Sequence, residues 1–154
     1  VAGRLGWAAA GLAILGRGFR SPRALVDAHR VPEPAYSAGP AAALHGATSM
    51  IDISDGLVAD VRHLAQASGC SIHIHSNLLV VDDSVAQAAA AFNVDPLSWV
   101  LTGGEDHALV ATFPAKAGLP SGFVMIGEVK EGTAGVVVDG EPVDAGGGWD
   151  HFRT

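Results

Sequence analysis

The sequence predicts a single α/β domain in which helices pack mainly on one face of a mixed β-sheet. The chain has 154 residues, of which 49% are hydrophobic and 16% are charged, so it can bury a core without disulfide bonds. Apolar residues recur at helical spacing through the first third, whereas short apolar or alternating runs fill the last third. A helix-rich start followed by mixed elements and a strand-rich end is typical of a layered α/β or α+β fold.

The first third is expected to form helices joined by tight turns. A helix is predicted over about 6–17, and its apolar residues at helical spacing should form the buried face: Leu5, Ala9, Leu12, Leu15 and Phe19. Ser21 is expected to cap a second helix that has Pro22 as its first residue. Prolines interrupt the next segment, and a short alanine-rich helix should end near Leu44.

A strand, helix, strand unit is predicted in the middle of the chain. The short apolar run 48–53 indicates a strand, and Gly69 should end the helix that follows it. The residues expected on one face of this helix are Leu57, Val61, Leu64, Ala65 and Ser68. The run 71–76 alternates strictly between apolar and polar residues, so it is predicted to be a second strand.

The rest of the chain is expected to be richer in strands. A helix is predicted over 83–91, a strand from about 107 to 113, and a further strand over 122–129. Asp139 and Gly140 lie between two short apolar runs, and this dipeptide is a strong signal for a β-hairpin.

Net charge, hydropathy and cysteine content argue against binding to nucleic acid or a membrane and against an internal disulfide bond. The formal net charge of −7 gives no support for binding nucleic acid or an anionic membrane. No apolar run reaches the roughly 20 residues that span a bilayer. The single cysteine, Cys70, excludes an internal disulfide bond and suits a reducing compartment, so we expect a cytoplasmic protein.

The segment "DISDG" is the first candidate site. It places Asp52 at the end of a predicted strand, with Ser54 and Asp55 in the turn before a helix. Backbone N–H groups at a helix start favour anions and nearby carboxylates attract hard cations, so a metal-bound polyphosphate would satisfy both. The same pattern also fits ordinary helix capping, with Asp60 as a solvated side chain, and taken alone it favours capping.

The segment "GGED" is the second candidate site. Gly103 and Gly104 allow a ligand to approach the backbone closely, and Glu105 and Asp106 follow them directly. A plain glycine turn with exposed acids is the alternative. The chain contains no Walker-type phosphate loop, so neither segment belongs to that class of nucleotide site.

Several segments in a fixed order resemble one family. "GRLGWAAAGLAIL", "PEPAYSAG", "MIDISDGLVADVRHLAQASG", "LTGGEDHAL" and the terminal "GWDHF" resemble the C-terminal half of thiamine-monophosphate kinase. This family is part of an ATP-binding superfamily that includes aminoimidazole ribonucleotide synthetase and selenophosphate synthetase. The resemblance spans nearly the whole chain, and it favours metal and phosphate binding over simple capping at "DISDG".

The resemblance implies a reaction and a set of site residues. The family transfers the γ-phosphate of ATP to thiamine monophosphate, giving thiamine diphosphate, with several Mg²⁺ ions and no covalent phosphoenzyme. At matching positions, Asp52 and Asp55 would be Mg²⁺ ligands and Ser54 would contact ATP. Glu105 would contact the thiamine moiety, and Trp149 would contact the substrate. No residue is implied to act as a nucleophile, because the substrate phosphate itself attacks.

The resemblance also implies an incomplete protein. Residues 1–154 would be a single C-terminal domain with the aminoimidazole ribonucleotide synthetase-like fold, inactive alone. The N-terminal domain, which in the family supplies most of the ATP and Mg²⁺ site and the usual homodimer interface, would be absent. His107 and Ala108 depart from the tyrosine and glutamate that the family commonly has there. Two alternatives remain open: a superfamily kinase or synthetase with another phosphate acceptor, and a noncatalytic α/β binding module.

Overall fold

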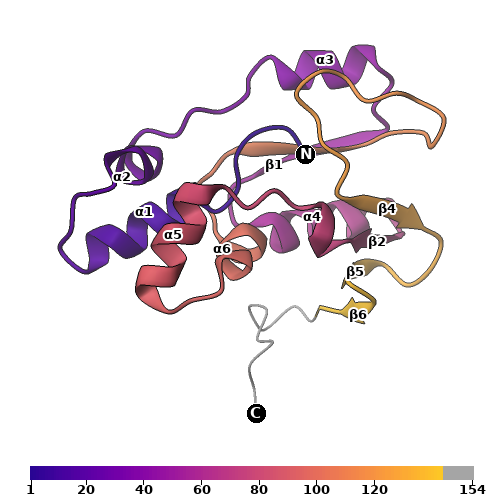
Figure 1. The fold of residues 1–154 in the computed structure, drawn as a ribbon. Helices are drawn as coiled ribbons and strands as arrows, with labels where there is room; N and C mark the ends of the chain where they lie inside the picture. The colour runs from indigo at the N-terminus through magenta and orange to yellow at the C-terminus, as the bar shows by residue number, and fades with distance from the viewer. Residues whose placement is uncertain (144–154) are drawn as a thin grey trace.

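A computed structural model of the chain describes residues 1–143, and it contains helices packed against two small sheets (Figure 1). Along the chain, the helices are α1 (Trp7–Gly16), α2 (Arg23–Arg30), α3 (Ala38–Leu44), α4 (Leu57–Ser68), a 3-10 turn η1 (Ser76–Leu78), α5 (Asp83–Phe92) and α6 (Pro96–Thr102). The strands are β1 (Ser49–Ile53), β2 (Ser71–Ile74), β3 (Ala108–Thr112), β4 (Gly127–Lys130), β5 (Gly135–Val138) and β6 (Glu141–Pro142).

The strands form one antiparallel pair and one mixed sheet. β1 pairs antiparallel with β3, with Ile53 opposite Ala108 and Ser49 opposite Thr112. The second sheet has the order β4-β2-β5-β6, in which only β2 and β5 run parallel. Helix α4 packs against both sheets, whereas α3 covers the opposite face of the β1–β3 pair. The predicted α/β class and mixed sheet are therefore confirmed.

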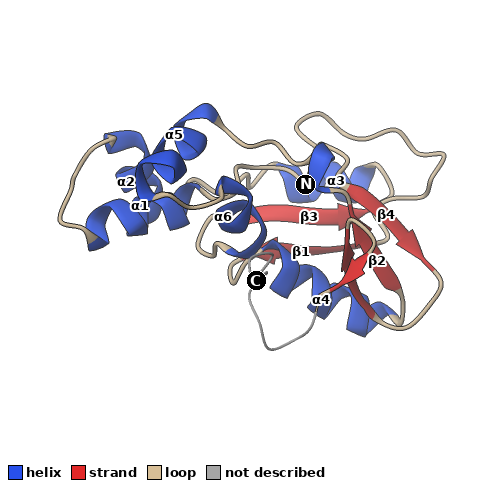
Figure 2. Ribbon diagram, turned by 60° about the horizontal axis from the view of Figure 1, so that its bottom comes forward, coloured by secondary structure: helices blue, strands red, loops and turns tan. Residues whose placement is uncertain are grey.

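Three apolar clusters hold these layers together. The largest joins α4 to both sheets and includes Ile53, Leu57 and Val138, which are fully buried. A second cluster joins α1, α2 and α5 through Ile14, Leu25 and Val85. Figure 2 shows these three helices gathered at one end of the molecule, with the strands at the other. The third cluster packs α3 on the outer face of β3.

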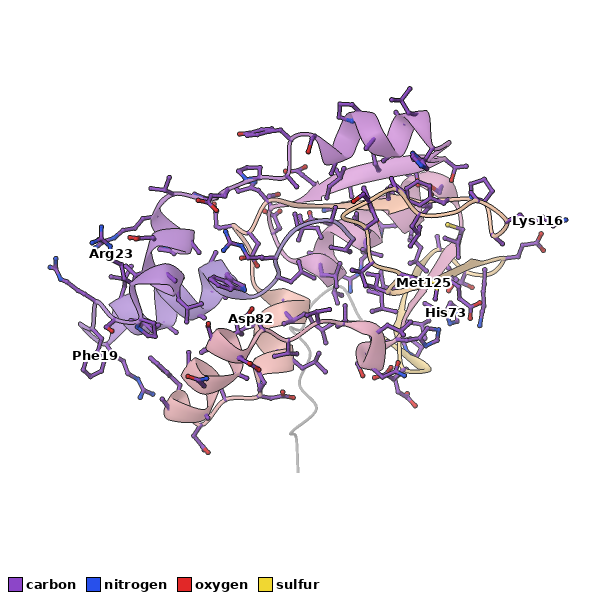
Figure 3. The ribbon with its side chains drawn as sticks, turned by 45° about the horizontal axis from the view of Figure 1, so that its top comes forward. Phe19, Arg23, His73, Asp82, Lys116 and Met125 are labelled. Carbon is purple, nitrogen blue, oxygen red and sulfur yellow. The ribbon has the colours of Figure 1, made fainter. Side chains whose placement is uncertain are left out.

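The predicted buried face of α1 is correct only in part, because Leu5 is buried and Ala9 and Leu15 are half-buried, whereas the other two residues are exposed. Its most buried residues are small or lie on a different stripe, namely Ala8, Ala10, Gly11 and Ile14. Leu12 is 56% exposed and Phe19 is 62% exposed, and Figure 3 shows Phe19 projecting from the helical end of the molecule. The cause is close packing on α2, because a Cβ added at Gly11 would lie 2.1 Å from the Leu25 carbonyl oxygen. A small residue, rather than a leucine, therefore lies where the two helices approach most closely.

The other helices agree with the prediction from the sequence, with two exceptions. α2 begins at Arg23 with Pro22 as its N-cap, so the predicted cap at Ser21 is one residue too early. Helix α6 was not predicted, although Asp95 accepts a hydrogen bond from the Leu97 N–H and Pro96 fills the first position. Both are ordinary helix-start signals, but this seven-residue helix is too short to show a clear apolar period.

Each predicted strand is present in the structure, but the predicted ends are less accurate. β2 ends at Ile74, because a 3-10 turn begins at Ser76. The predicted strand 122–129 overlaps β4 (Gly127–Lys130) only in its last three residues. The predicted strand, helix, strand unit exists along the chain, but β1 and β2 lie in different sheets. The hairpin at Asp139 and Gly140 is confirmed, and both residues have positive φ as its tight turn requires. No helix among residues 1–143 is long and apolar enough to cross a membrane.

Candidate functional site

Pairing of β1 with β3 brings the two acidic segments together. Because the strands run antiparallel, the end of β1 lies beside the start of β3, and "DISDG" meets "GGED" at this edge. The Glu105 N–H donates to the Ser54 carbonyl oxygen at 2.7 Å, and the His107 N–H donates to the Ile53 carbonyl oxygen at 2.9 Å. The sequence alone did not show that these segments are neighbours, since they are far apart in the chain.

Glycines allow the two backbones to approach this closely. A Cβ added at Gly104 would lie 2.6 Å from the Ser54 carbonyl oxygen. At Gly56, φ is 125° and an added Cβ would lie 2.8 Å from the Thr102 carbonyl oxygen. Any side chain at either position would push the segments apart, so both glycines are required by packing, and Gly56 is required by its backbone conformation as well.

Asp60 holds the turn between β1 and α4. Its side chain is 3% exposed, and Oδ2 accepts hydrogen bonds from the Asp55 N–H at 2.9 Å and from the Gly56 N–H at 3.2 Å. The interpretation of Asp60 as a solvated side chain is therefore wrong. Simple capping by Ser54 or Asp55 is also wrong, because the N-cap of α4 is Gly56, which has no side chain to accept from the first turn of the helix.

Asp106 has a structural role at the start of α1. Its two carboxylate oxygens accept hydrogen bonds from the Gly6 N–H at 2.5 Å and the Ala8 N–H at 2.8 Å. Burial raises the pKa of this carboxyl above its ordinary value of 3.8, and the backbone hydrogen bonds partly oppose the shift. Asp106 therefore acts as a helix cap supplied from a distant part of the chain.

The remaining acids of the two motifs face solvent. The side chain of Asp52 is 63% exposed and that of Glu105 is 67% exposed, while Asp55 is exposed and Ser54 half-buried. The His107 ring lies between two of these acids, with Nδ1 3.7 Å from an Asp52 oxygen and Nε2 3.6 Å from a Glu105 oxygen. The structure therefore brings both predicted segments to one accessible edge. Trp149 lies outside the described residues.

The donor set at this edge suits a hard cation. The carboxylate oxygens of Asp52 and Asp55 are exposed, and the hydroxyl of the half-buried Ser54 makes only a long contact of 3.4 Å to Asp55. Within residues 1–143, no group of three or more His, Cys, Asp or Glu side chains is arranged to hold a metal. Mg²⁺ commonly binds through one or two protein carboxylates and completes its shell with water and phosphate oxygens. The residues present fit that mode of binding.

Sequence comparison identifies relatives along nearly the whole chain. The chain is 48% identical over 153 residues to a thiamine-monophosphate kinase of Mycobacterium tuberculosis, covering 99% of this chain and 45% of that protein. It is 36% identical to a thiamine-monophosphate kinase of Escherichia coli K12, covering all of this chain and 52% of that protein. The chain thus spans about half the length of these relatives. No protein-family model matches it.

Solved structures give the same result. Thiamine monophosphate kinase from Aquifex aeolicus superimposes with a TM-score of 0.84 at 34% identity, over 93% of this chain and 50% of that one. A structure of AaThiL complexed with AMPPCP and TMP gives a TM-score of 0.86 at 36% identity, over 98% of this chain and 50% of the other. By sequence and by fold, the chain is similar to about half the length of thiamine-monophosphate kinases.

Proposed function

We propose that residues 1–154 form the C-terminal domain of a thiamine-monophosphate kinase. The complete protein transfers the γ-phosphate of ATP to thiamine monophosphate, and this domain supplies one wall of the site. The observation that carries the proposal is the exposed acidic edge where "DISDG" and "GGED" meet, on a chain that matches this family along nearly its whole length. A related structure with an ATP analogue and TMP supports the choice of substrates.

Each site residue has a role that suits its position in the proposal. Asp52 and Asp55 hold Mg²⁺, and Ser54 contacts ATP. Glu105 contacts the cationic thiamine moiety, and Trp149 contacts the substrate. Mg²⁺, when bound, supplies positive charge that offsets the repulsion between ATP and the acceptor phosphate.

The chain's own contribution to the reaction is to position the groups that bind the metal and the substrates. Phosphoryl transfer needs alignment and charge neutralisation more than a nucleophilic side chain, because an oxygen of the acceptor phosphate attacks. Asp60 fixes the backbone that carries Asp55, and the hydrogen bond between Glu105 and Ser54 sets the spacing between the two motifs. The edge can therefore present its acids without rearranging.

The proposal includes the rest of the protein. An N-terminal domain that lies outside this chain supplies the remaining ATP and Mg²⁺ ligands, so the 154-residue chain is inactive alone. The complete protein is a cytoplasmic homodimer. The alternatives of another phosphate acceptor and of a noncatalytic binding module each predict a different outcome in the experiment below.

The test is ATP-dependent formation of thiamine diphosphate by the complete protein and by its Asp52→Ala and Asp55→Ala variants. We expect each variant to lose at least about 100-fold in kcat/KM, the size typical of removing a group that stabilises developing charge. Excess Mg²⁺ should restore part of the loss. Glu131→Ala is the matched control, because it removes an exposed carboxylate from the turn after β4.

Each outcome has a defined meaning. Unchanged activity in both aspartate variants removes their metal role. A complete protein that phosphorylates a different acceptor but not thiamine monophosphate supports another member of the superfamily. A complete protein that shows no Mg²⁺-dependent nucleotide binding supports the noncatalytic module.

A further inference from the structure

The His107 ring lies between the two exposed acids of the site and is bonded to neither. Its side chain is 33% exposed and belongs to the residue directly before β3. Nδ1 lies 3.7 Å from an Asp52 carboxylate oxygen, and Nε2 lies 3.6 Å from a Glu105 carboxylate oxygen. Both distances exceed the roughly 3.2 Å limit of an ordinary N–H···O hydrogen bond. A shift of less than about 1 Å would therefore let the ring donate to either acid.

The backbone that carries this ring is held in an uncommon conformation. Glu105 and His107 have φ values of 69° and 51°, in the left-handed region that residues other than glycine rarely adopt. Their N–H groups donate to the carbonyl oxygens of Ser54 and Ile53, and the Asp106 carboxylate between them accepts from the start of α1. Strained backbone that is maintained by surrounding contacts is a feature of functional sites. Because these contacts fix the main chain, the ring and the Glu105 carboxylate can turn only about their own side-chain bonds.

A neutral imidazole can hydrogen-bond only one of the two acids at a time. It has one N–H donor, and its other nitrogen presents a lone pair that a carboxylate repels. In the proposed site the charge of Asp52 is offset by Mg²⁺, so the lone pair of Nδ1 can face Asp52 at a lower cost. The hydrogen then lies on Nε2, which faces Glu105. A hydrogen bond to a charged acceptor is about twice as strong as one between neutral groups, so it would hold the Glu105 carboxylate in one orientation.

We propose that His107 is a positioning residue that couples the Mg²⁺ side of the site to the thiamine side by orienting Glu105. The inference rests on the proposed function, which assigns Asp52 to Mg²⁺ and Glu105 to the cationic thiamine moiety. Coupling between two binding sites is reciprocal, so Mg²⁺ should tighten thiamine binding by the same factor as thiamine tightens Mg²⁺ binding. The effect depends on the two ring nitrogens, and a ring of the same shape without them should lose it.

The test measures the binding of thiamine to the complete protein by calorimetry, once with Mg²⁺ and AMPPCP present and once with neither. Thiamine is the probe because it lacks the phosphate that would contact the metal directly, and AMPPCP does not transfer its terminal phosphate. We define the coupling ratio as the Kd for thiamine without Mg²⁺ and AMPPCP divided by the Kd with them. The ratio should be at least about 5 in the parent, and His107→Phe should lose most of it.

Three further variants separate positioning from a merely structural role. His107→Asn keeps an N–H donor and suits the left-handed conformation, so it should retain part of the ratio. His45→Phe makes the same change at the exposed end of α3 and should keep the parent's ratio. In a Glu105→Ala background, His107→Phe should change the ratio no further, because the ring acts through the Glu105 carboxylate.

Each result supports or overturns the coupling. A ratio near one in the parent, or the same ratio in the parent and in His107→Phe, would overturn it. An equal loss in the Glu105→Ala background would show that the ring does not act through Glu105. The same preparations are assayed for thiamine diphosphate formation. An inactive parent whose coupling ratio is lost in His107→Phe removes the proposed function and keeps the coupling, whereas an active parent with an unchanged ratio in His107→Phe does the reverse.

Discussion

The acids of the two motifs divide into two groups when their surroundings are compared residue by residue. Asp60 and Asp106 accept backbone hydrogen bonds and hold neighbouring segments in place. Asp52 and Glu105 are exposed and contact the His107 ring, and Asp55 is exposed at the turn. Residue type alone does not distinguish the groups, because both contain aspartates within a few positions of a glycine.

Replacing Asp60 tests its role in holding the Asp55 turn. Asp60→Ala leaves the N–H groups of Asp55 and Gly56 without their acceptor, so we expect a loss of about 1–3 kcal/mol in the free energy of unfolding. Asp60→Asn keeps one oxygen and should lose less. In the complete protein, Asp60→Ala should also raise the Mg²⁺ concentration for half-maximal activity about 10-fold. Urea unfolding and Mg²⁺ titration measure the two effects, and an alanine variant as stable as the asparagine variant would contradict this role.

The elements show which local signals are reliable. Helices α4 and α5 follow their apolar spacing and end at Gly69 and Asn93, which adopt the left-handed conformation expected at helix ends. Helix α1 follows its leucine spacing only in part, because a small residue lies where it approaches α2 most closely. Propensity and spacing predict where a helix forms, but the partner helix decides which face is buried.

A pair of glycine variants in α1 tests this close contact. Gly11→Ala places a methyl group against the backbone of Leu25 and the side chain of His29, so it should lower the free energy of unfolding by about 1–3 kcal/mol. Gly16→Ala, in the last turn of the same helix, meets no atom within 4 Å and should be neutral or stabilise the protein by up to about 1 kcal/mol. Thermal and urea unfolding of both variants measure the difference. If both variants changed the free energy of unfolding equally, the close contact between α1 and α2 at Gly11 would not contribute to stability.

On the scale of the whole molecule, pairing between strands that are far apart in the sequence brings the residues of the site together. The α/β class, the strand at 48–53 and the helix after it could all be predicted, because they depend on local spacing. The antiparallel pairing of β1 with β3 could not, since two short strands contain no signal for which partner each takes. For the same reason, the sequence did not reveal that Asp106 caps a helix 98 residues earlier.

Asp106 links the helical end to the strands, and its raised pKa makes this link dependent on pH. Burial raises the pKa in the folded protein above the ordinary 3.8, so the carboxyl favours folding most when it is protonated. This contribution is fully present below pH 3.8 and is lost as the pH rises through the folded pKa. Asp106→Asn does not titrate. The free energy of unfolding of the parent minus that of the variant should therefore fall across this window, measured by urea unfolding at a series of pH values. A rise would show that the hydrogen bonds to Gly6 and Ala8 outweigh burial.

The division between acids that accept backbone hydrogen bonds and acids that are exposed has a consequence for how this protein tolerates substitutions. The backbone turn is fixed by Asp60 and the start of α1 by Asp106, so neither task falls to Asp52, Asp55 or Glu105. Substitutions at the three exposed acids can alter charge and ligand preference while the scaffold keeps its shape, as surface changes away from such supports usually cost little stability. Natural variation could therefore retune the chemistry of this edge in single steps, without first requiring a compensating mutation elsewhere.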